Sequence, residues 1–211
     1  MTKYFLIALG VSLVGYFVGS LPTGHLVGRS LGVDISKYGS GNIGATNVLR
    51  VLGRRWGYLV FSIDTLKGFL AVRVAFYLVQ IAKMGVERIE LLGILAAITC
   101  IMGHTFPIWL RFKGGKGVAT SAGALLGLMP LAIVAIFCVW LIIFQLTRYV
   151  SLASMGAAAA LPVVVGILIL RKFVTDDALL YFSVLIAGVV IWRHRSNLKR
   201  LINGTEHRFS R

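Results

Sequence analysis

Long runs of apolar residues, separated by short basic and glycine-rich stretches, make up most of the chain. Several of these runs reach the roughly 20 residues that an α-helix needs to cross the hydrocarbon core of a bilayer. We expect seven membrane-spanning helices, near residues 4–28, 56–82, 87–105, 117–130, 131–147, 154–170 and 178–193. The pattern predicts an all-α polytopic membrane protein with a single domain, 1–211, because no linker or low-complexity tract divides the chain.

The stretch 117–147 allows two interpretations. As one helix of 31 residues it would be about 46 Å long at a rise of about 1.5 Å per residue. That length exceeds a hydrocarbon core of about 30 Å. The alternative is two shorter helices hinged at Pro130, where proline interrupts the helical hydrogen bonds.

The distribution of charge favours the two shorter helices, because seven spans place most of the basic residues on one face of the membrane. The chain has 22 Lys and Arg against seven Asp and Glu, and 58% of its residues are apolar. Soluble domains carry roughly a quarter charged residues, so this composition excludes an ordinary soluble protein. With seven spans and the N-terminus outside, 15 of the 22 basic residues share one face with only Asp34 and Glu206. Basic residues accumulate on the cytoplasmic side; we therefore expect a cytoplasmic C-terminus, and we attribute the positive charge to topology and not to nucleic-acid binding.

Three basic segments, 37–50, 111–117 and 193–195, then lie on the cytoplasmic face. Glycine lets backbone N–H groups converge, and Lys or Arg adds positive charge, so the first two segments favour phosphate binding. Gly39 to Gly44 matches the dinucleotide fingerprint but lacks the strand and βαβ context that it needs. Segment 113–120 resembles a P-loop, yet Gly117 stands where Ser or Thr belongs and Leu110 replaces the first glycine. We therefore expect anion sites and no nucleotide fold.

Each segment also has a simpler interpretation, which the residues alone leave open. The first could be a solvated loop before a capped helix, and Lys113 and Lys116 could be anchors at the membrane face. Segment 193–195 could contact lipid headgroups. Asp64 and Lys67 lie three residues apart on one helix face, so they could pair structurally or act directly. No His or Cys spacing indicates a metal site.

Glycines at positions 15, 19, 24 and 28 form two G-x-x-x-G spacings in the first apolar run. This spacing is typical of closely packed helices. Pro22 is expected to kink that helix near its inner end.

Taken together, these segments resemble the bacterial acyl-phosphate-dependent glycerol-3-phosphate acyltransferases, and they cover nearly the whole chain in the family's order. The segments that carry the resemblance are Gly19–Gly24, Gly39–Arg50, Asp64–Gly68, Gly103–Pro107, Phe112–Thr120, Arg148–Ser154 and Arg193–Asn197.

The resemblance implies an acyltransferase that moves a fatty acyl group from acyl phosphate to the 1-hydroxyl of glycerol 3-phosphate. The products would be lysophosphatidate and inorganic phosphate, in phospholipid biosynthesis. It implies a multi-pass protein of the bacterial cytoplasmic (inner) membrane, with its active site on the cytoplasmic face and no cofactor or metal. The implied partners are acyl phosphate, glycerol 3-phosphate and the lipid bilayer, with a functional link to an enzyme that produces acyl phosphate.

The resemblance, together with the residue chemistry, gives a set of expected site residues. Ser40, Arg50 and Lys116 are expected to be catalytic. The residues expected to bind substrate are Gly41, Asn42, Gly44, Thr46, Asn47, Ser154, His194 and Asn197.

Two other classes of protein remain as alternatives. An organic-phosphate transporter or exchanger shares basic loops and intramembrane charges, although no internal repeat is visible. An acyltransferase that uses acyl-CoA would be expected to carry a His-x-x-x-x-Asp pair, which the chain lacks.

Overall fold

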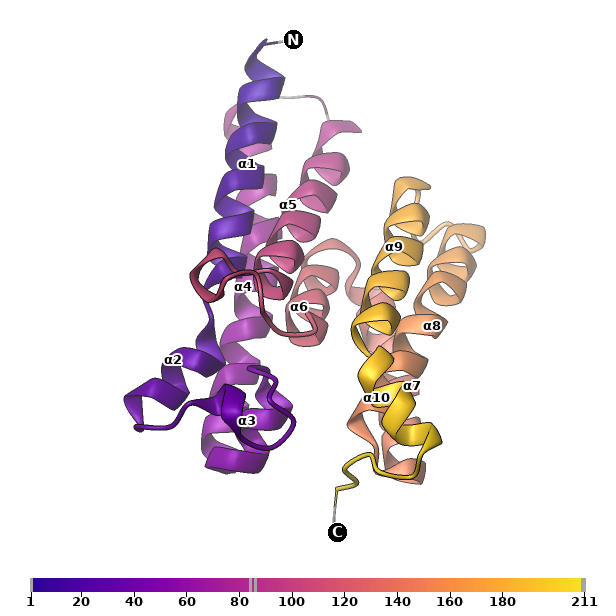
Figure 1. The fold of residues 1–211 in the computed structure, drawn as a ribbon. Coiled ribbons are helices and arrows are strands. Elements are labelled where there is room, and N and C mark those ends of the chain that lie inside the picture. The colour runs from indigo at the N-terminus through magenta and orange to yellow at the C-terminus, as the bar shows by residue number, and fades with distance from the viewer. Residues whose placement is uncertain (1, 84, 86, 210–211) are drawn as a thin grey trace. The chain divides into compact units, whose positions relative to one another are not determined.

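The computed structural model describes residues 2–83, 85 and 87–209, and every regular element within them is a helix (Figure 1). The chain divides into two compact units, 1–128 and 129–211. The helices of the first unit are α1 (Thr2–Ser20), α2 (Thr23–Ser30), η1 (Ile35–Lys37), α3 (Ala45–Leu52), α4 (Arg54–Ile81), α5 (Glu87–Thr105), η2 (Ile108–Leu110) and α6 (Val118–Leu128). Those of the second are α7 (Pro130–Thr147), α8 (Val150–Leu170), α9 (Ala178–Arg193) and α10 (Arg195–Ile202).

Helices occupy each of the seven ranges in which spans were expected. By length and composition, however, four stretches in the described residues could cross a membrane: Lys3–Ser30, Ile89–Leu110, Pro130–Thr147 and Val150–Leu170. A fifth is added if α9 and α10, which are bent by 55° at their junction, form one broken span. The count of seven remains a prediction, because α6 has 11 residues and α4 carries charged residues along its length.

Pro22 and Pro130 each interrupt a helix where the sequence predicted. α1 ends at Ser20 and α2 begins at Thr23, so the kink expected at Pro22 is confirmed. α6 ends at Leu128 and α7 begins at Pro130, which occupies the first turn. Stretch 117–147 is therefore two helices.

Close helix contacts build the first unit. α1 packs against α5, and α4 packs against α5 and α6 (Figure 1). A Cβ atom at Gly15 would collide with the Thr99 side chain, and one at Gly19 with the Cys100 carbonyl. The close packing predicted from the G-x-x-x-G spacing is thus confirmed in α1. In the second unit α8 contacts both α7 and α9.

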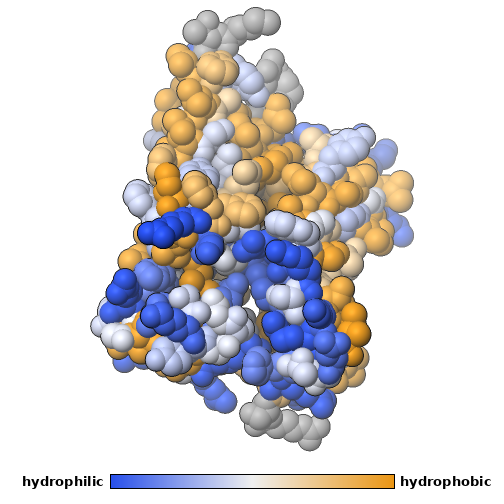
Figure 2. Space-filling view, viewed as in Figure 1, coloured by the Kyte–Doolittle hydropathy of each residue, from blue (hydrophilic) through white to orange (hydrophobic). Residues whose placement is uncertain are grey.

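The polar part of the first unit is built from α2, η1 and α3, which gather around the N-terminal half of α4 (Figure 1). A small hydrophobic core, formed by Ile35, Ile43, Val48 and Val60, lies beneath these elements. The face of this unit shown in Figure 2 is hydrophobic over α1 and hydrophilic over α2 and α3. The first basic segment therefore rests on an apolar base.

Candidate functional site

Asn47 is the centre of the first basic segment. It lies on α3 and is 2% exposed. Its Oδ1 accepts a hydrogen bond from the Ser40 backbone N–H at 2.8 Å. Its Nδ2 donates to the carbonyls of Ile35, Tyr38 and Asn42 at distances of 3.2, 3.1 and 2.8 Å. A buried amide that is satisfied on both its donor and acceptor sides holds a loop in one conformation.

The turn itself depends on glycine. Gly39 and Gly41 have φ angles of +59° and +70°, a region that other residues occupy only with strain. A Cβ atom at Gly39 would also collide with Oδ1 of Asn47. The glycines thus allow the backbone to wrap around the Asn47 amide.

The segment then leads into the N-terminus of α3. Asn42 Oδ1 accepts a hydrogen bond from the Gly44 N–H at 2.8 Å. Gly44 is the N-cap residue, and no side chain caps α3, so the N–H groups of its first turn can meet an anion. Thr46 lies in this turn, and Arg50 follows it by four residues on the same side of the helix; both are half-buried.

We expect Asn47→Ala to destabilise the protein by about 2–3 kcal/mol, because several buried backbone groups lose their partner. The measurement is the free energy of unfolding in detergent. Gln80→Ala is the matched control, since this exposed amide on α4 should change stability by less than about 0.5 kcal/mol. Equal stabilities for the two variants would show that the Asn47 contacts do not hold the segment.

The second basic segment, residues 111–117, is attached to the end of α5 by backbone hydrogen bonds. The N–H of Gly114 donates to the Thr105 carbonyl at 3.2 Å, and that of Gly115 donates to the His104 carbonyl at 3.1 Å. Gly117 has a φ of +78° and directly precedes α6. The segment therefore presents Lys116 at the N-terminal end of a helix, where positive charge and N–H groups coincide.

The two lysines of this segment differ in exposure. Lys113 is exposed, whereas Lys116 is half-buried between two largely buried glycines, Gly115 and Gly117. Of the two interpretations that the sequence left open, a simple membrane-face anchor suits Lys113, and a bound anion suits the enclosed position of Lys116.

Leu110 brings the two basic segments together. It belongs to η2, directly before the second segment, and packs against the hydrophobic core of Ile35, Ile43, Val48 and Val60 beneath the first. Segments separated by about sixty residues in the sequence thus share one base in the first unit. From the distribution of charge, the sequence predicted only that these segments lie on the same face of the membrane.

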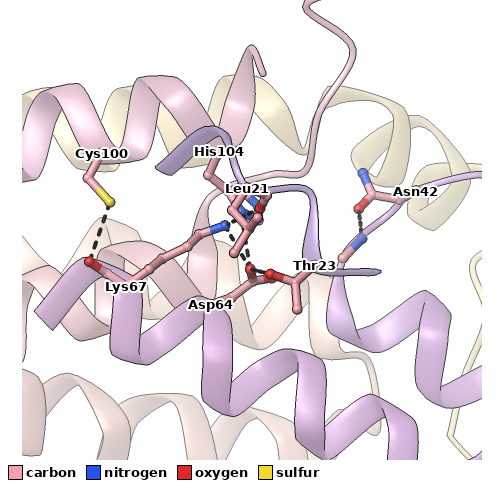
Figure 3. A network of polar contacts seen from close by, with 8 residues as sticks. Leu21, Thr23, Asn42, Asp64, Lys67, Cys100 and His104 are labelled. Atoms are coloured by element: carbon pink, nitrogen blue, oxygen red, sulfur yellow. Dashed lines mark hydrogen bonds and ion pairs between the residues drawn. The ribbon is translucent and has the colours of Figure 1, made fainter. Parts of the chain in front are cut away.

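A buried polar network includes residues of α2, α4 and α5 (Figure 3), and its His104 also accepts the backbone hydrogen bond from Gly115 of the second segment. Lys67 Nζ is 2.8 Å from Asp64 Oδ1, so the two residues form the ion pair that their spacing allowed. Thr23 Oγ1 donates to the same carboxylate oxygen at 3.0 Å, and His104 Nδ1 lies 3.7 Å from it. Lys67 also donates to the Leu21 carbonyl at 3.1 Å, at the break between α1 and α2.

Sequence reasoning missed the parts of this network that come from Thr23 and His104. The only indication in the sequence was that both residues lie in segments that carry the resemblance to the acyltransferase family. No spacing rule relates either of them to Asp64, because the three residues come from different helices.

The three site residues expected in the second unit are buried. Ser154 Oγ accepts a hydrogen bond from Trp140 Nε1 at 3.2 Å. His194 Nδ1 lies 2.8 Å from the Val190 carbonyl, at the junction of α9 and α10. Asn197 Nδ2 donates to Glu206 Oε1 at 2.7 Å. Each side chain is therefore held in a defined orientation.

Glu206 organises the C-terminal segment, and sequence reasoning missed this role. It is 8% exposed and accepts hydrogen bonds from Ser151 Oγ at 2.8 Å and Arg200 Nε at 2.7 Å, besides that from Asn197. Burial by itself raises the pKa of the Glu206 carboxyl, but the hydrogen bonds from Asn197, Arg200 and Ser151 outweigh it and leave the pKa lowered. The indication in the sequence was that Glu206 is the one carboxylate in an otherwise basic C-terminal stretch.

We expect Glu206 to make stability depend on pH. Because its pKa is lowered by folding, its contribution is complete above the ordinary value of 4.5 and is lost as the pH falls through the folded value. Glu206→Gln should lower the free energy of unfolding by about 2 kcal/mol at pH 7. It should also reduce the further loss of stability as the pH falls. Thermal unfolding of both proteins in detergent from pH 7 downward measures this; parallel profiles would contradict the role of Glu206.

The expected site residues thus fall into two groups. Ser40, Gly41, Asn42, Gly44, Thr46, Asn47, Arg50 and Lys116 belong to the first unit, where both basic segments share one base. Ser154, His194 and Asn197 belong to the second unit.

Known proteins resemble this chain over nearly its whole length. The family model for glycerol-3-phosphate acyltransferase matches residues 9–204. Glycerol-3-phosphate acyltransferases from Geotalea daltonii and Desulforamulus reducens are 43% and 44% identical to it, over 100% and 90% of both chains. A crystal structure of PlsY, an integral membrane glycerol 3-phosphate acyltransferase in its glycerol 3-phosphate form, covers 96% of each chain with a TM-score of 0.83 and 37% identity. The lysophosphatidic acid form of PlsY has a TM-score of 0.81 at the same identity.

The helices and the two basic segments define the class as a multi-helix integral membrane protein with glycine-rich cationic loops at helix N-termini. The matches identify the family within that class. The chain belongs to the glycerol-3-phosphate acyltransferase family.

Proposed function

We propose that the chain transfers a fatty acyl group from acyl phosphate to the 1-hydroxyl of glycerol 3-phosphate, releasing lysophosphatidate and inorganic phosphate. The observation that carries this proposal is the near-complete match to PlsY, whose solved structures include a glycerol 3-phosphate form and a lysophosphatidic acid form. The first unit supports it, because two cationic segments on a shared base suit a reaction between two phosphate-bearing substrates.

In this reaction the 1-hydroxyl oxygen attacks the acyl carbonyl carbon, and the bond between that carbon and the phosphate oxygen breaks. The phosphate leaves with the bonding electrons, and a substrate phosphate accepts the hydroxyl proton. Ser40, the Gly41–Thr46 turn and Lys116 hold the acyl phosphate and stabilise the negative charge that develops on its carbonyl and departing phosphate. Arg50 binds the phosphate of glycerol 3-phosphate through its planar guanidinium.

The two asparagines of the first segment contribute through its shape. Asn47 orients the Ser40 backbone, and Asn42 orients Gly44 at the start of α3. In the second unit, Ser154, His194 and Asn197 contact glycerol 3-phosphate, and Glu206 holds Asn197 in position.

We further propose seven membrane spans with the N-terminus outside, one functional domain over 1–211, and an active site on the cytoplasmic face of the bacterial inner membrane. The excess of basic residues in segments 37–50, 111–117 and 193–195 supports this orientation. An enzyme that produces acyl phosphate would supply the donor.

The direct test uses the purified protein in detergent with palmitoyl phosphate and glycerol 3-phosphate. We expect lysophosphatidate and inorganic phosphate to form in equal amounts, and no product when palmitoyl-CoA replaces palmitoyl phosphate. Product formation in detergent excludes a simple transporter, because a transporter needs two compartments. Activity with palmitoyl-CoA alone would refute the acyl-phosphate donor.

A further inference from the structure

The ring of His104 lies between the buried carboxylate and the second basic segment. On one side, Nδ1 is 3.7 Å from Asp64 Oδ1. On the other side, Nε2 is the atom that a Cβ added to Gly115 would meet first. The His104 carbonyl also accepts the hydrogen bond from the Gly115 N–H. His104 therefore touches the residue that directly precedes Lys116 through both its ring and its backbone.

The ring has little room to move away from this position. His104 is 7% exposed, and its neighbours Asp64 and Lys67 are 2% and 4% exposed. The Asp64 carboxylate is shared among His104, Lys67 and Thr23, which come from α5, α4 and α2 (Figure 3). A buried carboxylate that is ion-paired with Lys67 and accepts a hydrogen bond from Thr23 is costly to disturb, so it stays fixed beside the His104 ring.

The position of Lys116 depends on that of Gly115. Lys116 is followed by Gly117 and then by the first turn of α6, so a shift of the backbone at Gly115 moves both the ammonium group and the helix N-terminus. The proposed reaction needs both at the developing charge, and displacements of about 1 Å cost large factors in rate.

We propose that His104, oriented by Asp64, is a positioning residue that sets the place of Lys116 through contact of its ring with Gly115. This inference rests on the proposed function, because it takes Lys116 as the group that meets the reacting phosphate.

A double-mutant cycle between His104 and Gly115 tests the contact. Gly115→Ala places a methyl group against the ring, and His104→Ala removes the ring; each should lower kcat by about tenfold or more, with a smaller change in KM. In the double variant the methyl group fills the vacated space, so its kcat should be no lower than that of the slower single variant. If the kcat reductions of the two single variants multiply in the double variant, the proposal is overturned.

Two further glycines supply the controls. Gly10→Ala, on α1, has no atom within 4 Å of its added Cβ and should retain the wild-type rate. An added Cβ at Gly114 would collide with the backbone carbonyl of His104 and not with its ring. The reductions in kcat caused by Gly114→Ala and by His104→Ala should therefore multiply in the double variant, unlike those caused by Gly115→Ala and His104→Ala.

Loss of fold is separated from loss of position by replacing the ion pair with apolar residues. The double variant Asp64→Leu/Lys67→Met keeps the volume and removes both buried charges. We expect it to unfold near the wild-type temperature, yet to have a kcat at least about tenfold lower because the ring is no longer oriented. A stable variant with the wild-type kcat would overturn the role of Asp64.

Amide hydrogen exchange of residues 114–121, without substrate, gives a readout that does not depend on the reaction. His104→Ala should speed this exchange at least about tenfold, while exchange in α8 stays unchanged. If the wild type transfers no acyl group but this result is obtained, the proposed function fails and the positioning role stands. If the wild type is active and both exchange and kcat are unchanged in His104→Ala, the positioning role fails.

Discussion

Replacing Arg50 or Lys116 with alanine will reduce the rate of lysophosphatidate formation at least about a hundredfold, equivalent to about 2.7 kcal/mol of transition-state stabilisation. Both residues are half-buried: Arg50 lies on α3, whose Val48 belongs to that hydrophobic core, and Lys116 follows η2, whose Leu110 packs against the same core. A positive charge enclosed in this way acts in a lower dielectric than one in water, so its loss is felt more strongly. The measurement is kcat/KM with palmitoyl phosphate as donor.

Exposed basic residues on the same elements provide the matched controls. Lys113 lies in the same segment as Lys116, and Arg54 begins α4 directly after α3; both are exposed. Lys113→Ala and Arg54→Ala should remain within about threefold of the wild type, because exposed charges are screened by solvent. Near-normal rates for folded Arg50→Ala and Lys116→Ala would remove these two residues from the site.

Replacing Asp64 with alanine will lower the free energy of unfolding by about 3–5 kcal/mol, which is typical of removing one member of a buried ion pair. The substitution leaves the Lys67 ammonium, 4% exposed, without its carboxylate partner. It also removes the acceptor for Thr23 and the charge that faces His104. Denaturant or thermal unfolding in detergent measures the change.

A comparison with two other variants identifies the cause of this loss. Asp177→Ala removes an exposed carboxylate and should cost less than about 0.5 kcal/mol. The double variant Asp64→Leu/Lys67→Met should recover most of the lost stability, since no unpaired charge remains buried. If the double variant is as unstable as Asp64→Ala, the loss comes from packing and not from the charge.

Much of the secondary structure followed from local chemistry. The breaks at Pro22 and Pro130 were predictable because proline lacks the N–H that continues a helix, and both are found. The spacing of Gly15 and Gly19 predicted close packing, and the structure identifies α5 as the partner. The Asp64–Lys67 pair was predictable because residues three apart share one helix face.

The roles of the site residues were harder to predict from the sequence. Asn47 was expected to bind substrate, and the structure places both ends of its amide in contacts with its own loop. Its chemistry is the same in either role, so residue type could not separate them. Glu206 stood out only as a carboxylate in a basic tail, and its three donors come from α8 and α10.

The sequence by itself determined the membrane character of the chain, the positions of its helices and the clustering of its basic residues. These properties depend on transfer free energy, helix periodicity and net charge, which act over a few neighbouring residues. Only the tertiary structure showed that Leu110, beside the second basic segment, packs against the hydrophobic core beneath the first. It also showed that the Asp64 carboxylate lies beside His104 and Thr23. Contacts between distant helices depend on how their faces fit together, and no local pattern specifies that fit.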